Sequence, residues 1–274
     1  LYFVSYDGLV NNNSFQKNGL LTYKATSTPP GTPPTAMPSS PPRARRHHLV
    51  DRRRRPHPAL RRLPQRHLPG VSALDGRLHL NMDSHSDGFT YVKSVAGLLD
   101  NPTGLSWTAA RFGTPMSTLD GLTLTSQFTY PQFIATPEGR LQLSYRAGVS
   151  GNGRNGLAEY DGSAWTALGE WTASTGTYSS EHGSSTARNM YLHGIDYDAN
   201  GRLHAFFTWR EQNGAVMCNG GGITNHDTGY AYSDDRGRTW RTGAGTVVGT
   251  TGGSDKVAVT DAGLVVDAST PTTP

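Results

Sequence analysis

The chain has 274 residues, of which only 35% are hydrophobic while 33 are glycine. This composition favours short strands joined by glycine-rich turns over helices. The sequence contains no apolar run of about 18 residues, the length that a membrane-spanning helix needs. The single cysteine, Cys218, excludes an internal disulfide framework.

The net charge of +4 comes from one segment of the chain. Residues 25–70 contain ten of the 25 Lys and Arg residues and one of the 21 Asp and Glu residues. The rest of the chain therefore has 15 basic and 20 acidic residues, a balance of −5. We expect neither nucleic acid nor a membrane as a partner, because the positive charge describes one segment and not a binding surface.

In chain order, residues 1–24 are expected to begin an all-β domain, with the end of one repeat unit at residues 11–23. Residues 25–69 do not continue it, since they hold 11 of the 17 prolines and 4 of the 10 histidines, and such proline density breaks helical and strand periods. One interpretation is a disordered basic linker. The other is a segment translated out of frame: in the frame that starts at each codon's second base, Arg61–Arg66 can encode Asp-Asp-Ser-His-Ser-Ala. Either origin predicts a segment without regular structure.

From residue 70 to residue 274 the sequence is periodic. An Asp-Gly, Glu-Gly or Asn-Gly turn followed by Arg-Leu recurs with its glycine at positions 76, 139 and 201, which are 63 and 62 residues apart. Each turn leads into an alternating strand, as in a β-hairpin. In each repeat a strand with tyrosine and a closing strand with tryptophan follow, at Tyr91 and Trp107, Tyr160 and Trp165, and Tyr232 and Trp240.

Four strands per repeat of this length predict the blades of an all-β propeller. About three whole blades fit into residues 70–274, and we expect a complete ring of six or seven blades, with seven preferred, so that the chain is truncated at its C-terminus. Residues 233–240, SDDRGRTW, also match the Asp-box pattern S-x-D-x-G-x-x-W. In that pattern the carboxylate braces a turn and the tryptophan packs between blades, so Asp235 is interpreted as structural.

Tyrosine, arginine and histidine recur at the ends of the predicted hairpins that lie far from the turns. In a hairpin, residues equidistant from the turn face each other. Tyr130 and Arg146 flank the second turn almost symmetrically, Tyr191 and Arg210 flank the third, and His85 holds the same exit position in the first blade. A lone tyrosine usually packs and a lone arginine is usually solvated, but the shared position predicts that all five gather at one mouth of the propeller as an acid–base site.

Four segments resemble the BNR-repeat propellers that include the ulvan lyases: residues 75–94 (DGRLHLNMDSHSDGFTYVKS), 129–148 (TYPQFIATPEGRLQLSYRAG), 188–198 (RNMYLHGIDYD) and 226–240 (HDTGYAYSDDRGRTW). The opening residues 7–23 (DGLVNNNSFQKNGLLTY) are similar to the start of those domains. Ulvan lyases cleave an acidic polysaccharide by β-elimination at a uronic acid. The resemblance therefore implies an acidic polysaccharide as the partner.

The resemblance also implies roles for individual residues. His85 and Tyr130 match the acid–base positions, Arg146 matches the arginine that neutralises the uronate carboxylate, and Tyr191 falls near a further site tyrosine. We expect the charge of Arg146 to lower the pKa of Tyr130. Further substrate-binding candidates are Arg188, His193 and Arg210.

The sequence departs from the family at one catalytic position. A further family histidine precedes the His85 position in an Asp-Asp-Ser-His context, and here that slot falls at Pro64–Gln65. The out-of-frame translation restores Asp-Asp-Ser-His there. A chain that lacks this histidine is expected to have reduced activity or none.

The leading interpretation is a secreted polysaccharide lyase that acts on a uronate-containing glycan, although the chain itself opens without a signal peptide. A sialidase-like glycoside hydrolase is the first alternative. It would need a Tyr–Glu pair and three arginines, for which Arg146, Arg188 and Arg210 are candidates. A non-catalytic glycan-binding propeller or an inactive fragment is the second. No cofactor is required, although a structural Zn or Ca ion is one option. Cys218 and His226 are a candidate Zn pair, and the alternative for Cys218 is a buried thiol.

Overall fold

The computed structural model describes residues 2–4, 22–24, 69–82, 84–87, 89–101, 106–217 and 225–268. The predictions for residues 25–68 and for Cys218 lie outside the described residues. The chain divides into two units, residues 1–64 and residues 65–274. In the first unit, β1 (Tyr2–Val4) pairs antiparallel with β2 (Thr22–Lys24).

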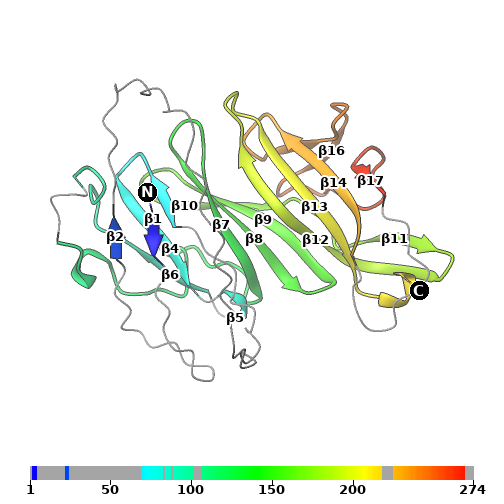
Figure 1. Cartoon of the computed structure of the whole chain (residues 1–274), viewed down its shortest axis with the longest axis horizontal. Helices are drawn as coiled ribbons and strands as arrows, with labels where there is room; N and C mark the ends of the chain where they lie inside the picture. The colour runs from blue at the N-terminus through cyan, green and yellow to red at the C-terminus, as the bar shows by residue number, and fades with distance from the viewer. Residues whose placement is uncertain are drawn as a thin grey trace, which may run out of the picture. The chain divides into compact units, whose positions relative to one another are not determined.

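The second unit is built from short and medium-length strands (Figure 1). In chain order its elements are β3 (Gly70–Ser72), β4 (Arg77–Met82), β5 (His85–Asp87), β6 (Thr90–Lys93), η1 (Ala109–Arg111), β7 (Phe128–Ala135), β8 (Leu141–Val149), β9 (Asn152–Tyr160), β10 (Trp165–Glu170), β11 (Thr175–Ser180), β12 (Gly183–Tyr197), β13 (Leu203–Glu211), η2 (Gly214–Met217), β14 (Asn225–Ser233), β15 (Thr239–Arg241), β16 (Val247–Thr250) and β17 (Val265–Asp267). Over the described ranges the helical elements are these two 3-10 turns, and no helix there has the length and apolar character to cross a membrane.

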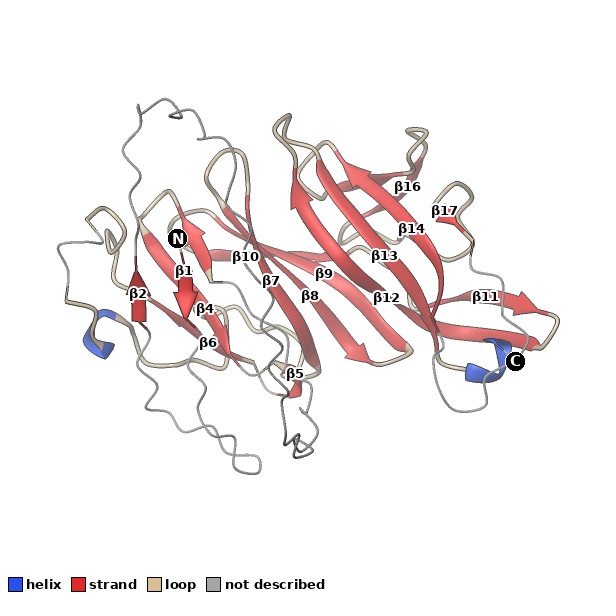
Figure 2. Cartoon of the chain, viewed as in Figure 1, coloured by secondary structure: helices blue, strands red, loops and turns tan. Residues whose placement is uncertain are grey.

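The strands of the second unit form three antiparallel sheets (Figure 2). The first has the order β3-β4-β6, the second β10-β9-β8-β7-β5, and the third β11-β12-β13-β14-β15-β16 with β17 paired to β14. Most neighbours within a sheet are also neighbours along the chain, which is the meander expected for one blade. The predicted all-β class and repeat order are confirmed.

The three predicted turns lie where the sequence places them, between β3 and β4, between β7 and β8, and between β12 and β13. Gly76, Gly139 and Gly201 have φ angles of 63°, 81° and 85°. This left-handed backbone costs glycine little and disfavours residues with a Cβ atom. The recurrence of glycine at this position therefore follows from the geometry of the hairpin turn.

The tyrosine strands are confirmed as β6, β9 and β14, and two of the three tryptophan strands as β10 and β15. The prediction of a closing strand at Trp107 is wrong, because Trp107 lies in the loop between β6 and β7. Two isolated bridges occupy the place beside β6 instead, from Phe112 to Ser94 and from Met116 to Tyr91. Met116 and Tyr91 exchange backbone hydrogen bonds in both directions (2.7 and 2.9 Å), so the nitrogen of Pro115 points away from β6, where a residue without an N–H is tolerated.

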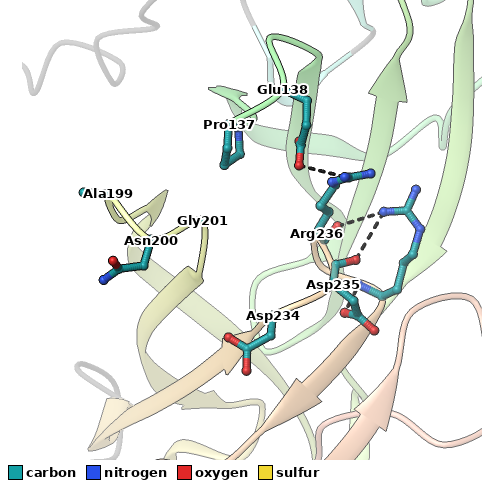
Figure 3. A pocket seen from close by; sticks show the side chains of 9 residues that line it. Pro137, Glu138, Ala199, Asn200, Gly201, Asp234, Asp235 and Arg236 are labelled. Carbon is teal, nitrogen blue, oxygen red and sulfur yellow. Dashed lines mark hydrogen bonds and ion pairs between the residues drawn. The ribbon is translucent and has the colours of Figure 1, made fainter.

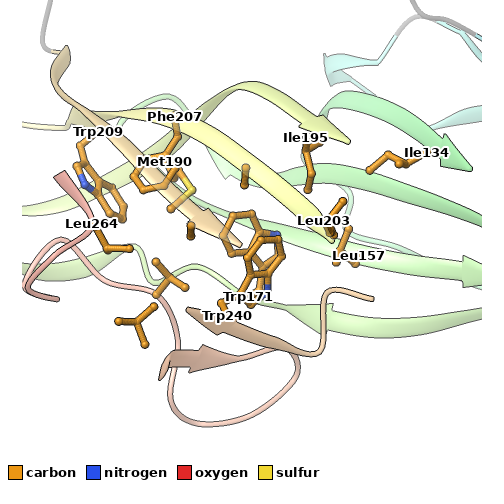
Figure 4. Packing of buried hydrophobic residues seen from close by; sticks show 14 residues of the cluster. Ile134, Leu157, Trp171, Met190, Ile195, Leu203, Phe207, Trp209, Trp240 and Leu264 are labelled. Atoms are coloured by element: carbon orange, nitrogen blue, oxygen red, sulfur yellow. The ribbon is translucent and has the colours of Figure 1, made fainter. Parts of the chain in front are cut away.

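The second and third sheets pack through a buried apolar cluster (Figure 4). Trp171, just after β10, stacks on Trp240 of β15 with ring centroids 3.9 Å apart, and both are fully buried. Next to them, the Asp235 carboxylate accepts hydrogen bonds from the Ser233 hydroxyl (2.7 Å) and the Thr239 backbone N–H (2.7 Å). These bonds fix the turn between β14 and β15 and so orient Trp240 toward the second sheet.

Candidate active site

The ends of β5, β7 and β8 that lie away from the hairpin turn meet in one row. Thr129 of β7 pairs on one side with Arg146 of β8 and on the other with the backbone of His85 in β5. The sequence analysis placed His85 at the exit of the first hairpin, whereas the structure pairs β5 with β7 in the second sheet. The chain leaves β4 at Ser84, whose hydroxyl donates to Asn81 Oδ1 (2.8 Å). His85 is thereby brought to the edge of the strand that carries Tyr130.

Tyr130 lies in a β-bulge of β7. The pairing with β8 shifts register between Thr129 and Gln132, and Tyr130 has a φ of 56°. A left-handed backbone is uncommon for a tyrosine and costs on the order of 1–3 kcal/mol, while a bulge redirects the side chain. As a result the Tyr130 ring centroid lies 4.8 Å from the Arg146 guanidinium carbon and 5.8 Å from the Tyr191 ring.

The third sheet contributes Tyr191 from β12 and Arg210 from β13. Tyr191 pairs with Thr208, two residues from Arg210 on the same face of the sheet. Arg146 Nη1 donates to the Tyr191 hydroxyl (3.2 Å), and the guanidinium carbons of Arg146 and Arg210 both lie 5.6 Å from the Tyr191 ring centroid. The structure thus brings together four of the predicted residues, with the Tyr191 phenol flanked by two cations.

Arg146 is almost completely buried, with 3% of its surface exposed. Its Nη2 donates to the Thr129 hydroxyl (3.1 Å), and its Nη1 bonds to Tyr191. The positive charge of Arg146 therefore acts mainly on Tyr130 and Tyr191. Arg210 is only partly buried, so its guanidinium is the more accessible of the two.

The two phenols have opposite pKa shifts. Burial, followed by the neighbouring Tyr191, raises the pKa of Tyr130 above its usual value, and the attraction of Arg146 does not outweigh them. The expected lowering is therefore wrong. Burial would also raise the pKa of Tyr191, but the Ser150 hydrogen bond and the charges of Arg146 and Arg210 lower it overall. In such a coupled pair one phenol keeps its proton while the other gives it up more readily.

The structure does not bring Arg188, a predicted substrate-binding residue, together with the tyrosines. Its side chain is fully buried, with Nε and Nη2 bonded to the Glu211 carboxylate at 2.7 and 3.1 Å and Nη1 to the Gly176 carbonyl at 2.9 Å. Successive residues of a strand point to opposite faces, so Arg188 lies on the face opposite Tyr191. Its role here is structural.

His193 lies at the border of the site. It is the extra residue of a bulge in β12 between Leu192 and Gly194, and its side chain is exposed. Its Nε2 lies 3.2 Å from the Thr208 hydroxyl, and Thr208 is the strand partner of Tyr191. His193 can therefore contact a ligand that extends past Tyr191.

His226 is buried and contacts the same Glu211 carboxylate oxygen as Arg188. Its Nε2 lies 2.8 Å from Glu211 Oε1, and its Nδ1 lies 2.9 Å from Asp227 Oδ2. With both ring nitrogens engaged by carboxylates, His226 offers no nitrogen to a metal ion in this arrangement. In the part of the chain that the structure describes, no three His, Cys, Asp or Glu residues are grouped to hold a metal. The Cys218–His226 site stays a prediction, since Cys218 is outside those ranges.

A cavity of about 630 Å³ lies at the opposite ends of the strands, among the hairpin turns (Figure 3). It is lined by the turns around Glu138 and Asn200 and by Asp234, Asp235 and Arg236. Arg236 Nη2 forms an ion pair with Glu138 there (2.7 Å). The tyrosine pair is not part of this lining, so the cavity is separate from the candidate active site.

Ser150 is the site residue that the sequence analysis missed. It lies in the turn between β8 and β9, where its hydroxyl is 3.2 Å from that of Tyr191 and accepts a hydrogen bond from Arg210 Nε (2.8 Å). The glycines that flank it, in the segment GVSGNG, indicate a tight turn at the tyrosine end of the blade. That turn is the signal that could have identified it.

Comparison with known proteins defines the class. The pattern of the BNR repeat-containing family matches residues 70–273, and the chain belongs to this family. A search of curated proteins gave no match. Among solved structures, the chain is similar to polysaccharide lyase Uly1, with a TM-score of 0.56, 20% identity, and coverage of 73% of this chain and 45% of that chain.

A second solved structure is the polysaccharide lyase PL25 ulvan lyase bound to -[GlcA(1-4)Rha3S]-, with a TM-score of 0.50, 12% identity, and coverage of 73% of this chain and 44% of that chain. The fold is a β-propeller, as the repeats predict. The chain spans less than half the length of these two structures.

Proposed function

We propose that this protein is a polysaccharide lyase that cleaves an acidic, uronate-containing glycan by β-elimination. The observation that supports it best is the pair of phenols, Tyr130 and Tyr191, set between the guanidinium groups of Arg146 and Arg210. Elimination at a uronate needs a cation for the carboxylate, a base for the C5 proton and an acid for the leaving O4. This site contains all three kinds of group.

The roles follow from accessibility and from the pKa directions. Arg210 contacts the uronate carboxylate, and the buried Arg146 adds positive charge behind the phenols. Neutralising the carboxylate makes the C5 proton more acidic, because charge develops there in the transition state. Tyr130, whose pKa is raised by burial and by Tyr191, keeps its proton and donates it to O4. The proton acceptor is Tyr191 or His85, the residue whose backbone pairs beside Tyr130.

Each of the two solved structures named above is a polysaccharide lyase, one of them bound to a glucuronate-containing unit. Their likeness supports the proposal by analogy of fold. A secreted location belongs to the same proposal, since polysaccharide substrates are found outside the cell.

A sialidase-like hydrolase fits the site less well. Sialidases use a tyrosine nucleophile, which a Glu carboxylate activates, and three arginines that hold the substrate carboxylate. The Tyr191 phenol instead contacts a serine hydroxyl and two guanidinium groups. Arg188, the third arginine of that alternative, is fully buried and paired with Glu211.

The test is incubation of the chain with uronate-containing polysaccharides, including ulvan, while ultraviolet absorbance and reducing ends are followed together. A lyase produces an unsaturated sugar, so both signals rise in step. New reducing ends without absorbance would indicate a hydrolase. Binding without either signal would identify a glycan-binding propeller and contradict the proposal.

A further inference from the structure

The hydroxyl of Ser150 joins two residues that come from a different sheet. Ser150 lies in the β8–β9 turn of the second sheet, whereas Tyr191 and Arg210 lie on β12 and β13 of the third. The hydroxyls of Ser150 and Tyr191 are 3.2 Å apart, and Arg210 Nε donates to the same Ser150 oxygen at 2.8 Å. While Tyr191 is protonated, its hydroxyl donates to Ser150 Oγ. Once Tyr191 is a phenolate, the Ser150 hydroxyl can turn and donate to it, because Ser150 Oγ accepts from Arg210 and keeps its own proton.

The turn that carries Ser150 is held against the third sheet by its backbone. The N–H of Gly151 donates to Asn189 Oδ1 at 2.5 Å. Gly151 has a φ of 76°, and a Cβ atom added to it would lie 2.8 Å from the Gln212 Cα atom. Backbone packed this closely leaves the turn little freedom, so the Ser150 hydroxyl has a fixed position relative to Tyr191.

Tyr191 faces more groups that favour a negative charge than Tyr130 does. Tyr191 faces Arg146 of β8 and Arg210 of β13 in addition to Ser150, and on β12 itself His193 is bonded to Thr208. Tyr130 of β7 faces Arg146, and its ring centroid lies 5.8 Å from that of Tyr191. The backbone of His85 on β5 pairs beside Tyr130, at Thr129. Two cations and a hydroxyl thus converge on one phenol.

We propose that Tyr191 accepts the C5 proton and that Ser150 is a positioning residue that holds the Tyr191 oxygen for this step. The inference rests on the proposed lyase function and assigns its proton acceptor. The Tyr191 phenolate takes the proton as the C5–H bond breaks, the electron pair forms the C4=C5 double bond, and the C4–O4 bond breaks. O4 takes the proton of Tyr130, so charge and atoms balance without any co-reactant.

The two tyrosines also provide a way back to the starting state. After elimination Tyr191 is a neutral phenol and Tyr130 is a phenolate. Their rings lie 5.8 Å apart, and the raised pKa of Tyr130 and the lowered pKa of Tyr191 favour the return of the proton to Tyr130. The pair is then ready for the next substrate.

A titration of tyrosinate absorbance tests the assignment in the absence of substrate. Among the 12 tyrosines, one should ionise before the others, and Tyr191→Phe should remove that component. Ser150→Ala should move it upward by about 1 pH unit, the effect of losing one hydrogen bond to a charged group. Ser150→Thr, which keeps a hydroxyl, should restore it in part. Ser179→Ala, at an exposed serine bonded to Ser184, is the matched control and should change nothing.

Activity on a uronate polymer supplies the second measurement. Ser150→Ala should move the acidic limb of the kcat profile upward by the same amount and lower kcat near neutral pH by up to about tenfold, with little change in KM. A loss of kcat without movement of either the titration or the limb would overturn the proposal, as would a Tyr191→Phe variant with an unchanged titration. If neither the chain nor a version with Asp-Asp-Ser-His restored around residue 64 shows elimination, the proposed function fails. The titration then decides separately whether Ser150 controls Tyr191.

Discussion

Arg188 was predicted to bind substrate, but in the structure it is buried in an ion pair with Glu211. Substitution of Arg188 by methionine tests whether its role is structural. Methionine keeps much of the aliphatic volume of arginine and removes the charge. Two hydrogen bonds to Glu211 are lost, together with those to the carbonyls of Gly176 and Ser185. Glu211 then keeps His226 as its remaining charge partner.

The magnitude follows from the burial of both partners, whose side chains are 0% exposed. Removal of one member of a buried ion pair costs about 3–5 kcal/mol, because the other charge stays buried without full compensation. For a unit of this size each kcal/mol lowers Tm by about 2–4 °C, so we expect a decrease of about 6–20 °C. Thermal unfolding followed by near-ultraviolet circular dichroism, together with urea unfolding, measures it.

Arg210→Met is the matched control, because Arg210 is partly exposed and its partners, Ser150 and Asn225, are uncharged. It should lose about 1 kcal/mol or less of stability while impairing turnover. Arg188→Met, assayed at a temperature where it stays folded, should retain the KM of the unchanged protein. A stability loss below about 1 kcal/mol for Arg188→Met would refute the argument from burial.

Three further outcomes are expected. Tyr130→Phe should lower kcat by about 10²–10⁴-fold with little effect on KM, because it removes the proton donor; near-normal steady-state turnover would show that the donor is another group. Burial would raise the pKa of Glu211, but hydrogen bonds from His226 and Arg188 hold it below the ordinary 4.5. Its stabilising contribution is therefore complete above that value and lost as the pH falls through the lower folded-state pKa, so urea midpoints should drop on acidification less steeply in Glu211→Gln than in the unchanged chain. Trp240→Ala should cost about 3–5 kcal/mol in urea unfolding, because the ring is fully buried against Trp171, and a loss near zero would mean that the two sheets do not depend on this contact.

The repeat and its turns could be predicted from the sequence because glycine recurs where the backbone must be left-handed. Gly76, Gly139 and Gly201 mark a local requirement that does not depend on the rest of the molecule. The gathering of tyrosine and arginine at one end of the strands followed from counting residues away from these turns. Local rules were sufficient for both.

Counting residues from the turns gave wrong partners where a strand contains a bulge. It also did not show which face of a strand each side chain lies on. The bulge adds one residue to β7 between Thr129 and Gln132. It therefore shifts the pairing, so that Arg146 pairs with Thr129 and not with Tyr130. Arg188 is three residues from Tyr191, an odd separation that puts the two on opposite faces of β12. A bulge and the choice of buried face depend on packing between sheets, which a single sequence does not display.

Contacts between sheets were beyond prediction for the same reason. Ser150 is separated by 41 residues from Tyr191 and by 60 residues from Arg210. The sequence marks the turn around Ser150 as glycine-rich, but it does not indicate which strand end lies opposite. The pKa of Tyr130 was expected to fall because its burial and the neighbouring Tyr191 of the third sheet, which raise it, are contacts of this kind.

Because a propeller repeats its blades, the second and third sheets each contribute one tyrosine and one arginine to the site. The proposed chemistry depends on the differences between these two pairs. The second sheet supplies Tyr130 and Arg146, and the third supplies Tyr191 and Arg210, so each blade contributes one phenol and one guanidinium. Two identical pairs would have similar pKa values and could not divide the work of acid and base. Tyr130 lies in a bulge and faces the Arg146 guanidinium. Tyr191 faces both Arg146 and Arg210 and is also hydrogen-bonded to Ser150 of the second sheet. In the proposed mechanism, one turn and one bulge are therefore the differences that make Tyr130 the proton donor and Tyr191 the proton acceptor.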